Sequence, residues 1–157
     1  MESGTPKSVS LGLFLILAGF LAACVFWRVA DPLFGIRSES GMKLSSEPVQ
    51  FLLKAFLSAV LVAAPAVFLS RQGKKGLAAS LAGLFGVLCV AAGQLFIYSN
   101  MLNPETDQPM GFSQGISELL WDLSFKGSPS TLYGGAFLVG ALSAVGTWLA
   151  GKRLPSG

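Results

Sequence analysis

The sequence predicts an all-α membrane protein, a single domain over residues 1–157, with four transmembrane helices and a short amphipathic helix in the last outer loop. Hydrophobic residues make up 52% of the chain and charged residues only 12%, against about 25% charged in a typical globular domain. The apolar residues gather in four runs long enough for a helix to cross about 30 Å of hydrocarbon. The runs lack the period-two alternation of membrane β-strands, so a four-helix bundle is favoured over a β-barrel.

The four predicted spans cover about residues 9–29, 51–70, 77–98 and 132–150. The second span has one charge, Lys54 in its first turn, and we expect the long stem of this lysine to carry the ammonium to the interface. Pro65 should kink the same helix or leave a carbonyl unpaired. We expect no buried ionisable group in any span, and this disfavours a self-sufficient proton-coupled carrier.

The connections predict the orientation. The link at residues 71–75 carries three basic residues and no acidic one, and the C-terminal tail is also basic, so both are expected in the cytoplasm. By parity the N-terminus is cytoplasmic too, and the two net negative connections lie outside. Arg28 is the exception, because it falls at the outer end of the first span; we expect it to pair with Asp31. The expected location is a bacterial inner membrane.

The outer connection at residues 100–130 contains an amphipathic segment with apolar residues at helical spacing. It predicts a helix over about residues 113–125 that begins at Ser113. This helix is too short to span, so its apolar side should be covered by the bundle, a partner or the interface, while its carboxylates stay solvated. Trp121 suits the depth of the outer interface, and Glu118 and Asp122 lie on the polar side. The apolar side holds Phe112, Ile116, Leu119, Leu120 and Leu123.

Glu118 and Asp122 lie four residues apart and share a face, so they could in principle perform acid–base chemistry or bind a cation. The same spacing is found on any solvated helix, and no nucleophile or cationic partner accompanies them, so we assign no catalytic residues. Histidine is absent, and Cys24 and Cys89 fall inside apolar runs, so we expect no metal, cofactor or disulfide framework. The basic residues suit membrane topology and indicate no nucleic-acid partner.

Small residues recur at helical spacing in the third and fourth spans. Such residues let backbones approach, and close packing drives helix association in lipid. The two spans therefore either pack on each other or bind another subunit. The packing candidates are Gly83, Gly86, Gly93, Gly140 and Ser143.

Gln94 is the one amide placed deep in a predicted span. It either lines a polar path or makes a hydrogen bond between helices, for example to the carbonyl that Pro65 leaves unpaired.

Residues 21–24, Leu-Ala-Ala-Cys, have the form of a bacterial lipoprotein cleavage site. If the site is used, Cys24 becomes a lipidated N-terminus and the first span is lost. The apolar run continues beyond Cys24 to full spanning length, which favours an unmodified cysteine inside an intact helix.

The first half of the chain has a glycine-punctuated span, a connection with Asp31, Pro32 and Gly35, a second span and a basic link. Over about residues 11–75 this layout resembles the small membrane subunit of tripartite tricarboxylate transporters. The resemblance implies a membrane subunit of a transporter. The chain departs from the pattern before the second span, where only Glu47 and Pro48 stand for a glycine- and proline-rich segment, and in its long acidic loop before the fourth span.

These observations predict a non-catalytic small subunit of a larger membrane complex, either a transporter or a respiratory or photosynthetic assembly. Its expected partners are the lipid bilayer and other membrane subunits or further copies of itself. One alternative is a small oligomeric transporter or channel. Another is a membrane enzyme that uses the outer-loop carboxylates.

Overall fold

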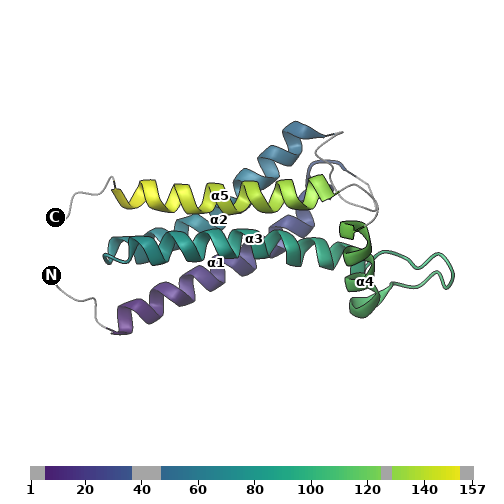
Figure 1. The fold of residues 1–157 in the computed structure, drawn as a ribbon, viewed down its shortest axis with the longest axis horizontal. Helices are drawn as coiled ribbons and strands as arrows, with labels where there is room; N and C mark the ends of the chain where they lie inside the picture. Colours follow the sequence, from purple (N-terminus) through teal and green to yellow (C-terminus); the bar gives the residue numbers. More distant parts are fainter. Residues whose placement is uncertain (1–5, 37–46, 125–128, 153–157) are drawn as a thin grey trace.

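The computed structural model describes residues 6–36, 47–124 and 129–152, and these residues form an all-α bundle (Figure 1). Four of the five described helices are long and apolar enough to cross a membrane, so the predicted fold class is confirmed. The helices are α1 (Pro6–Leu33), α2 (Pro48–Arg71), α3 (Lys75–Ser99), α4 (Gly111–Ser124) and α5 (Pro129–Lys152). The chain is therefore an integral membrane protein.

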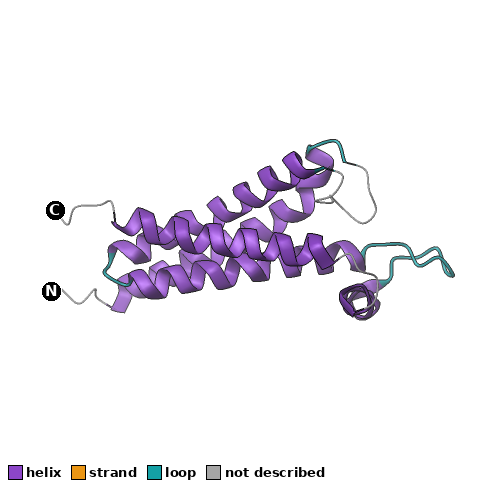
Figure 2. Ribbon diagram, turned by 45° about the horizontal axis from the view of Figure 1, so that its top comes forward, coloured by secondary structure: helices purple, strands orange, loops and turns teal. Residues whose placement is uncertain are grey.

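The short helix α4 lies across one end of the bundle. Figure 2 shows α4 nearly end-on, whereas the four long helices run along the length of the molecule. The start of α1 and the end of α5 lie together at the opposite end (Figure 1). Because α1 and α3 run toward α4, the turns that precede α4 and the end of α1 share one end of the bundle, which we call the α4 end.

The first helix extends further than predicted. It was expected to end near residue 29, but α1 continues through Asp31 and Pro32 to Leu33. Pro32 removes one backbone donor only in the last turn, where the loss costs little. Gly35, two residues beyond the end of α1, has a φ of +76°, a backbone conformation that favours glycine. Ile36 N then donates to the Asp31 carbonyl at 2.9 Å. Asp31 is thereby held inside a helix and not in a loop.

The helices pack on each other through small residues and leave large apolar side chains outside. The contact between α3 and α5 is the most extensive, followed by those of α2 with α1 and with α5. Gly19 of α1 lies against α2 so closely that a Cβ there would fall 2.5 Å from the Leu61 carbonyl oxygen and from Pro65 Cγ. Phe14, Val25 and Phe137 are among the exposed side chains, as expected of a surface that meets lipid.

Candidate functional site

A buried ion pair joins α1 to α2 at the α4 end. Lys54 Nζ donates to Asp31 Oδ1 at 2.6 Å, and the two side chains are only 2% and 6% exposed. A charged group inside a bundle is costly unless it is paired, so each residue accounts for the burial of the other. The pair carries no net charge and fixes the end of α1 to the second turn of α2.

Aromatic side chains close over this pair. Lys54 Nζ lies 4.3 Å from the centroid of the Trp27 ring, within the range of a cation–π contact. Trp27 in turn meets Phe51 edge to face, with ring centroids 6.0 Å apart. Both aromatic side chains are buried. The ammonium is thus covered by one carboxylate and by the face of an indole.

Glycines on α3 and α5 make room for Trp27. A Cβ on Gly93 would lie 2.5 Å from Trp27 Cδ1, and one on Gly135 would lie 3.1 Å from Trp27 Cη2. One tryptophan therefore contacts all three other long helices, through Lys54, Gly93 and Gly135. The polar pair and its aromatic cover form the meeting point of the four spans.

Three expectations about charges are corrected here. Lys54 does not reach the interface, because Asp31 binds it inside the bundle. Asp31 does not pair with Arg28, because its carboxylate is taken by Lys54. The spans do hold buried ionisable groups, although these lie toward the α4 end and away from the bundle centre. All three expectations were wrong for the same physical reason: Asp31 of α1 pairs with Lys54 of α2, and the spacing of residues along one helix does not reveal a contact with another helix.

The pair has the character of a structural contact. A general base or a nucleophile needs access to a substrate. Lys54 and Asp31 are buried beneath Trp27 and between their own helices, so a substrate does not reach them. Neither residue lines the two cavities described below.

Arg28 lies one residue beyond Trp27 and is half-buried. Its guanidinium carbon lies 5.9 Å from the centroid of the Phe96 ring on α3. Its Nε atom is buried and has no hydrogen-bond partner in the part of the chain that the structure describes. Sequence reasoning identified Arg28 as misplaced for its expected side of the membrane but assigned it the wrong partner.

Four of the five small-residue candidates meet between α3 and α5. A Cβ on Gly86 would fall 2.9 Å from the Val139 carbonyl oxygen and 3.0 Å from both Gly140 Cα and Ser143 Oγ. Gly83 lies near Gly140, and Ser143 also donates to the Ala59 carbonyl of α2 at 3.4 Å. Gly93 is not part of this contact, because it faces Trp27 of α1.

Gln94 is buried in the last turns of α3. The carbonyl freed by Pro65 belongs to Leu61, which lies against Gly19 of α1. Since α2 and α3 run antiparallel, Leu61 and Gln94 differ in depth by about 14 Å at 1.5 Å per residue. The bond to this carbonyl is therefore out of reach, while a role for Gln94 in a polar path or in a hydrogen bond to another helix stays a prediction.

The apolar side of α4 is only partly covered by the bundle. Helix α4 packs on α3 through Gly115, where a Cβ would lie 2.9 Å from Ser99 Cα and N. Leu119 and Glu118 are half-buried beside this contact, whereas Phe112 and Ile116 are exposed. Trp121 and Asp122 lie within α4, but their side chains are outside the described part.

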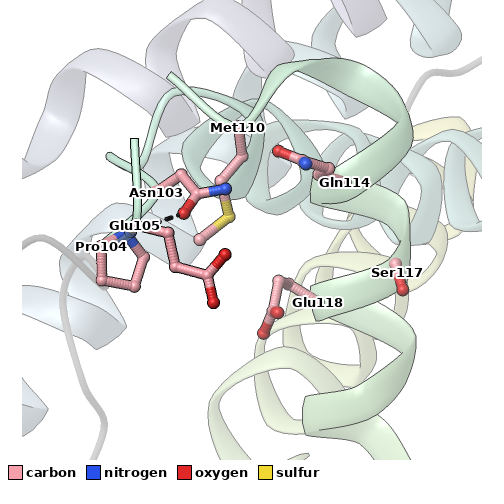
Figure 3. Close-up of a pocket in the computed structure, with 7 residues that line it drawn as sticks. All are labelled: Asn103, Pro104, Glu105, Met110, Gln114, Ser117 and Glu118. Carbon is pink, nitrogen blue, oxygen red and sulfur yellow. Dashed lines mark hydrogen bonds between the residues drawn. The ribbon is translucent and has the colours of Figure 1, made fainter. Parts of the chain in front are cut away.

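A small hollow lies between α4 and the turn that precedes it. It has a volume of about 280 Å³, and the Glu105 and Glu118 carboxylates both point toward it (Figure 3). The turn is held by the Asn103 side chain, which accepts a hydrogen bond from Glu105 N at 2.8 Å. The hollow is lined by Asn103, Pro104, Glu105, Met110, Gln114, Ser117 and Glu118.

This hollow differs from the carboxylate pair expected from spacing. Glu118 faces Glu105, thirteen residues away across a turn, and no sequence periodicity signals that approach. Within residues 6–36, 47–124 and 129–152, no group of three or more metal-ligating side chains comes together. Two carboxylates beside two amides and a hydroxyl form a polar surface without a recognisable nucleophile or acid–base pair.

No family model, curated protein or solved structure matches the chain, so the layout shared with the tricarboxylate-transporter subunit is not accompanied by a match to a family model.

Proposed function

We propose that this protein is a non-catalytic small subunit of a larger membrane complex and that α4 forms part of the surface that binds its partner. The observation that carries the proposal is the apolar side of α4, where Phe112 is 66% exposed and Leu120 57% exposed. Together with Ile116 these side chains form a row at positions i, i+4 and i+8, on the surface of a helix that does not span the bilayer.

An uncovered apolar row on so short a helix calls for a partner. A helix of 14 residues is marginal alone in water, and α4 is held to the bundle mainly through Gly115 and its neighbours. Burying one large apolar side chain is worth about 1.5–3 kcal/mol, so covering the row of three would stabilise α4 substantially. Another membrane protein that presents an apolar or aromatic surface supplies such a cover.

The buried pair supports a structural role over transport by a single chain. Carriers that couple to protons or ions place ionisable groups along a path through the membrane. Here Lys54 and Asp31 neutralise each other and are closed off by Trp27. Their position suits a contact that holds helices together.

Photo-crosslinking from α4 tests this proposal. A photoreactive amino acid at Leu120 should crosslink in native membranes to one distinct polypeptide, whereas the same probe at Gln114, exposed on another side of α4, should not. Purification in mild detergent followed by mass spectrometry should then find that polypeptide in stoichiometric amount. Adducts with lipid alone from position 120 would overturn the proposal, and a clean homo-oligomer would favour the oligomeric transporter.

We also propose that the N-terminus, the α2–α3 link and the C-terminus are cytoplasmic. The five basic residues in segments 71–75 and 152–153 support this orientation, because basic residues are retained on the cytoplasmic side. A topology reporter inserted after Gly73 and one fused after Arg153 should both report cytoplasm. A signal from the other side of the membrane at either position would reverse or invalidate the four-span orientation.

A further inference from the structure

An apolar groove runs between α1 and α3 on the outside of the bundle. Its volume is about 500 Å³, within the range of small-molecule sites, and it is open to the surroundings of the spans. Leu21 and Val25 on its α1 side and Phe96 on its α3 side are all more than half exposed. The groove is lined by Phe20, Leu21, Cys24, Val25, Arg28, Val29, Ala92, Gly93 and Phe96.

Among the described residues of this lining, Arg28 alone is charged. Its Nε is buried without a hydrogen-bond partner, and no carboxylate pairs with it among the residues that the structure describes. Asp31, the nearest acidic residue along α1, is taken by Lys54 at 2.6 Å. Because Asp31 and Lys54 neutralise each other, the positive charge of Arg28 remains at the groove.

The groove has the length of one membrane leaflet. From Phe20 to Val29 helix α1 rises by about 13 Å at 1.5 Å per residue, close to half of the ~30 Å hydrocarbon core. Arg28 lies near the end of the groove that faces the α4 end, five residues before α1 ends. An arginine at this depth can extend its guanidinium to the phosphate level while its stem stays in hydrocarbon.

We propose that this groove binds an anionic phospholipid of the leaflet at the α4 end. One acyl chain lies along the apolar walls from Phe20 to Phe96, and the headgroup phosphate accepts hydrogen bonds from the Arg28 guanidinium. A guanidinium binds phosphate through parallel charge-assisted hydrogen bonds. Charge complementarity selects an anionic lipid over a zwitterionic one, whose own ammonium compensates the phosphate.

Lipid counting on the intact protein tests the headgroup contact. The purified protein is reconstituted in phosphatidylcholine with about 20 mol% phosphatidylglycerol, an anionic fraction on the order of that which gives a membrane a marked surface potential. The lipids that stay bound are then counted by native mass spectrometry. Arg28→Gln should retain phosphatidylglycerol about tenfold less well, the loss expected when one charge-assisted contact is removed. Arg71→Gln, which removes an exposed arginine from the other end of the bundle, should change nothing.

The acyl-chain contact needs a second variant and a direct map. Ala92→Trp places a bulky side chain on the exposed wall of the groove and leaves Arg28 in place, so it should also reduce bound phosphatidylglycerol. Phosphatidylglycerol with a diazirine in its acyl chain should label Leu21, Val25 or Phe96. Unchanged thermal unfolding of the variants shows that the fold persists.

Three results would overturn this assignment. The first is equal retention of phosphatidylglycerol by Arg28→Gln and the native protein. The second is labelling of residues outside the groove. The third is a disulfide between two copies through Cys24, which would show that a second chain occupies the groove. Preferential labelling by a diazirine fatty acid over phosphatidylglycerol would also contradict it, since the ligand would then be a free carboxylate.

Discussion

Two contacts hold this bundle together by different means. Between α1 and α2 at the α4 end, one ion pair and an aromatic cover join helices whose side chains there are large: Trp27, Phe51 and Lys54. Between α3 and α5 the side chains are small, and backbones approach so closely that Gly86 leaves no room for a Cβ. The first contact is a strong polar bond at one depth, and the second is close packing along a length of helix.

The two contacts represent two ways in which helices associate where lipid provides no hydrophobic force. Close backbone packing spreads many small attractions over an interface, so each residue contributes modestly. A buried ion pair concentrates its effect in two residues, and loss of either leaves an uncompensated charge in a low-dielectric interior. Single substitutions should therefore have larger effects at the ion pair than at the α3–α5 contact.

The largest effect is expected from Lys54→Met. It keeps the length of the side chain but leaves the Asp31 carboxylate buried and unpaired, which should lower the free energy of unfolding by about 3–5 kcal/mol. Denaturant titration in mild detergent measures the loss. Arg71→Met on the same helix is the matched control, because Arg71 is exposed at the helix end, and it should cost less than about 0.5 kcal/mol. A similar loss in both variants would contradict the role of the pair.

An intermediate effect is expected from Gly86→Leu. The new side chain meets the Val139 carbonyl and Gly140 Cα, so α3 and α5 must move apart at a cost of about 1–3 kcal/mol. The same titration applies. Gly76→Leu is the matched control on the same helix, since a Cβ at Gly76 meets nothing within 4 Å. If Gly76→Leu were as damaging as Gly86→Leu, the close approach of α3 and α5 would not be the cause.

The smallest effect is expected from Ser143→Ala. It removes the hydrogen bond from Ser143 Oγ to the Ala59 carbonyl, which at 3.4 Å is long, and it keeps the small size that the α3–α5 contact needs. Hydrogen bonds between membrane helices average about 0.6 kcal/mol, so the loss should not exceed that value. A loss as large as that of Gly86→Leu would show that this contact depends on polar bonds and not on close packing.

The two contacts also differ in how far they could be foreseen. The four spans, their order and the short helix were predictable because apolar runs and helical periodicity are local properties of the chain. The small residues of α3 and α5 were visible for the same reason. What periodicity does not contain is which faces of separate helices meet, and so Gly93 was grouped with Gly83 and Gly86 although it packs on Trp27.

The ion pair escaped prediction because both partners had plausible local explanations. Lys54 lies in the second turn of α2, where a snorkelling stem is common, and Asp31 lies three residues from Arg28 on the same helix. The sequence did place two charged residues at the ends of apolar spans: Asp31 before Pro32 at the end of the first span, and Lys54 near the start of the second. Two opposite charges near the same end of consecutive antiparallel helices lie at similar depth, and that coincidence could have suggested the pair.

The apolar row on α4 was foreseen as a face but not as an uncovered one. The helical spacing identified Phe112 and Ile116, whereas the contact with α3 was made through Gly115, a residue without an apolar side chain. Close approach at a glycine turned the apolar row away from the bundle. That outcome depends on where Ser99 lies, which the sequence of α4 does not contain.

The most direct test of the account is a double-substitution cycle on the buried pair, comparing Asp31→Leu, Lys54→Met and the double variant. If the two residues act as one contact, each single variant should lose about 3–5 kcal/mol, while the double variant, which buries no charge, should be more stable than either single one. The free energies of unfolding in mild detergent decide the outcome. Losses that simply add in the double variant would show that Asp31 and Lys54 act independently and would contradict the structural role given to their pair.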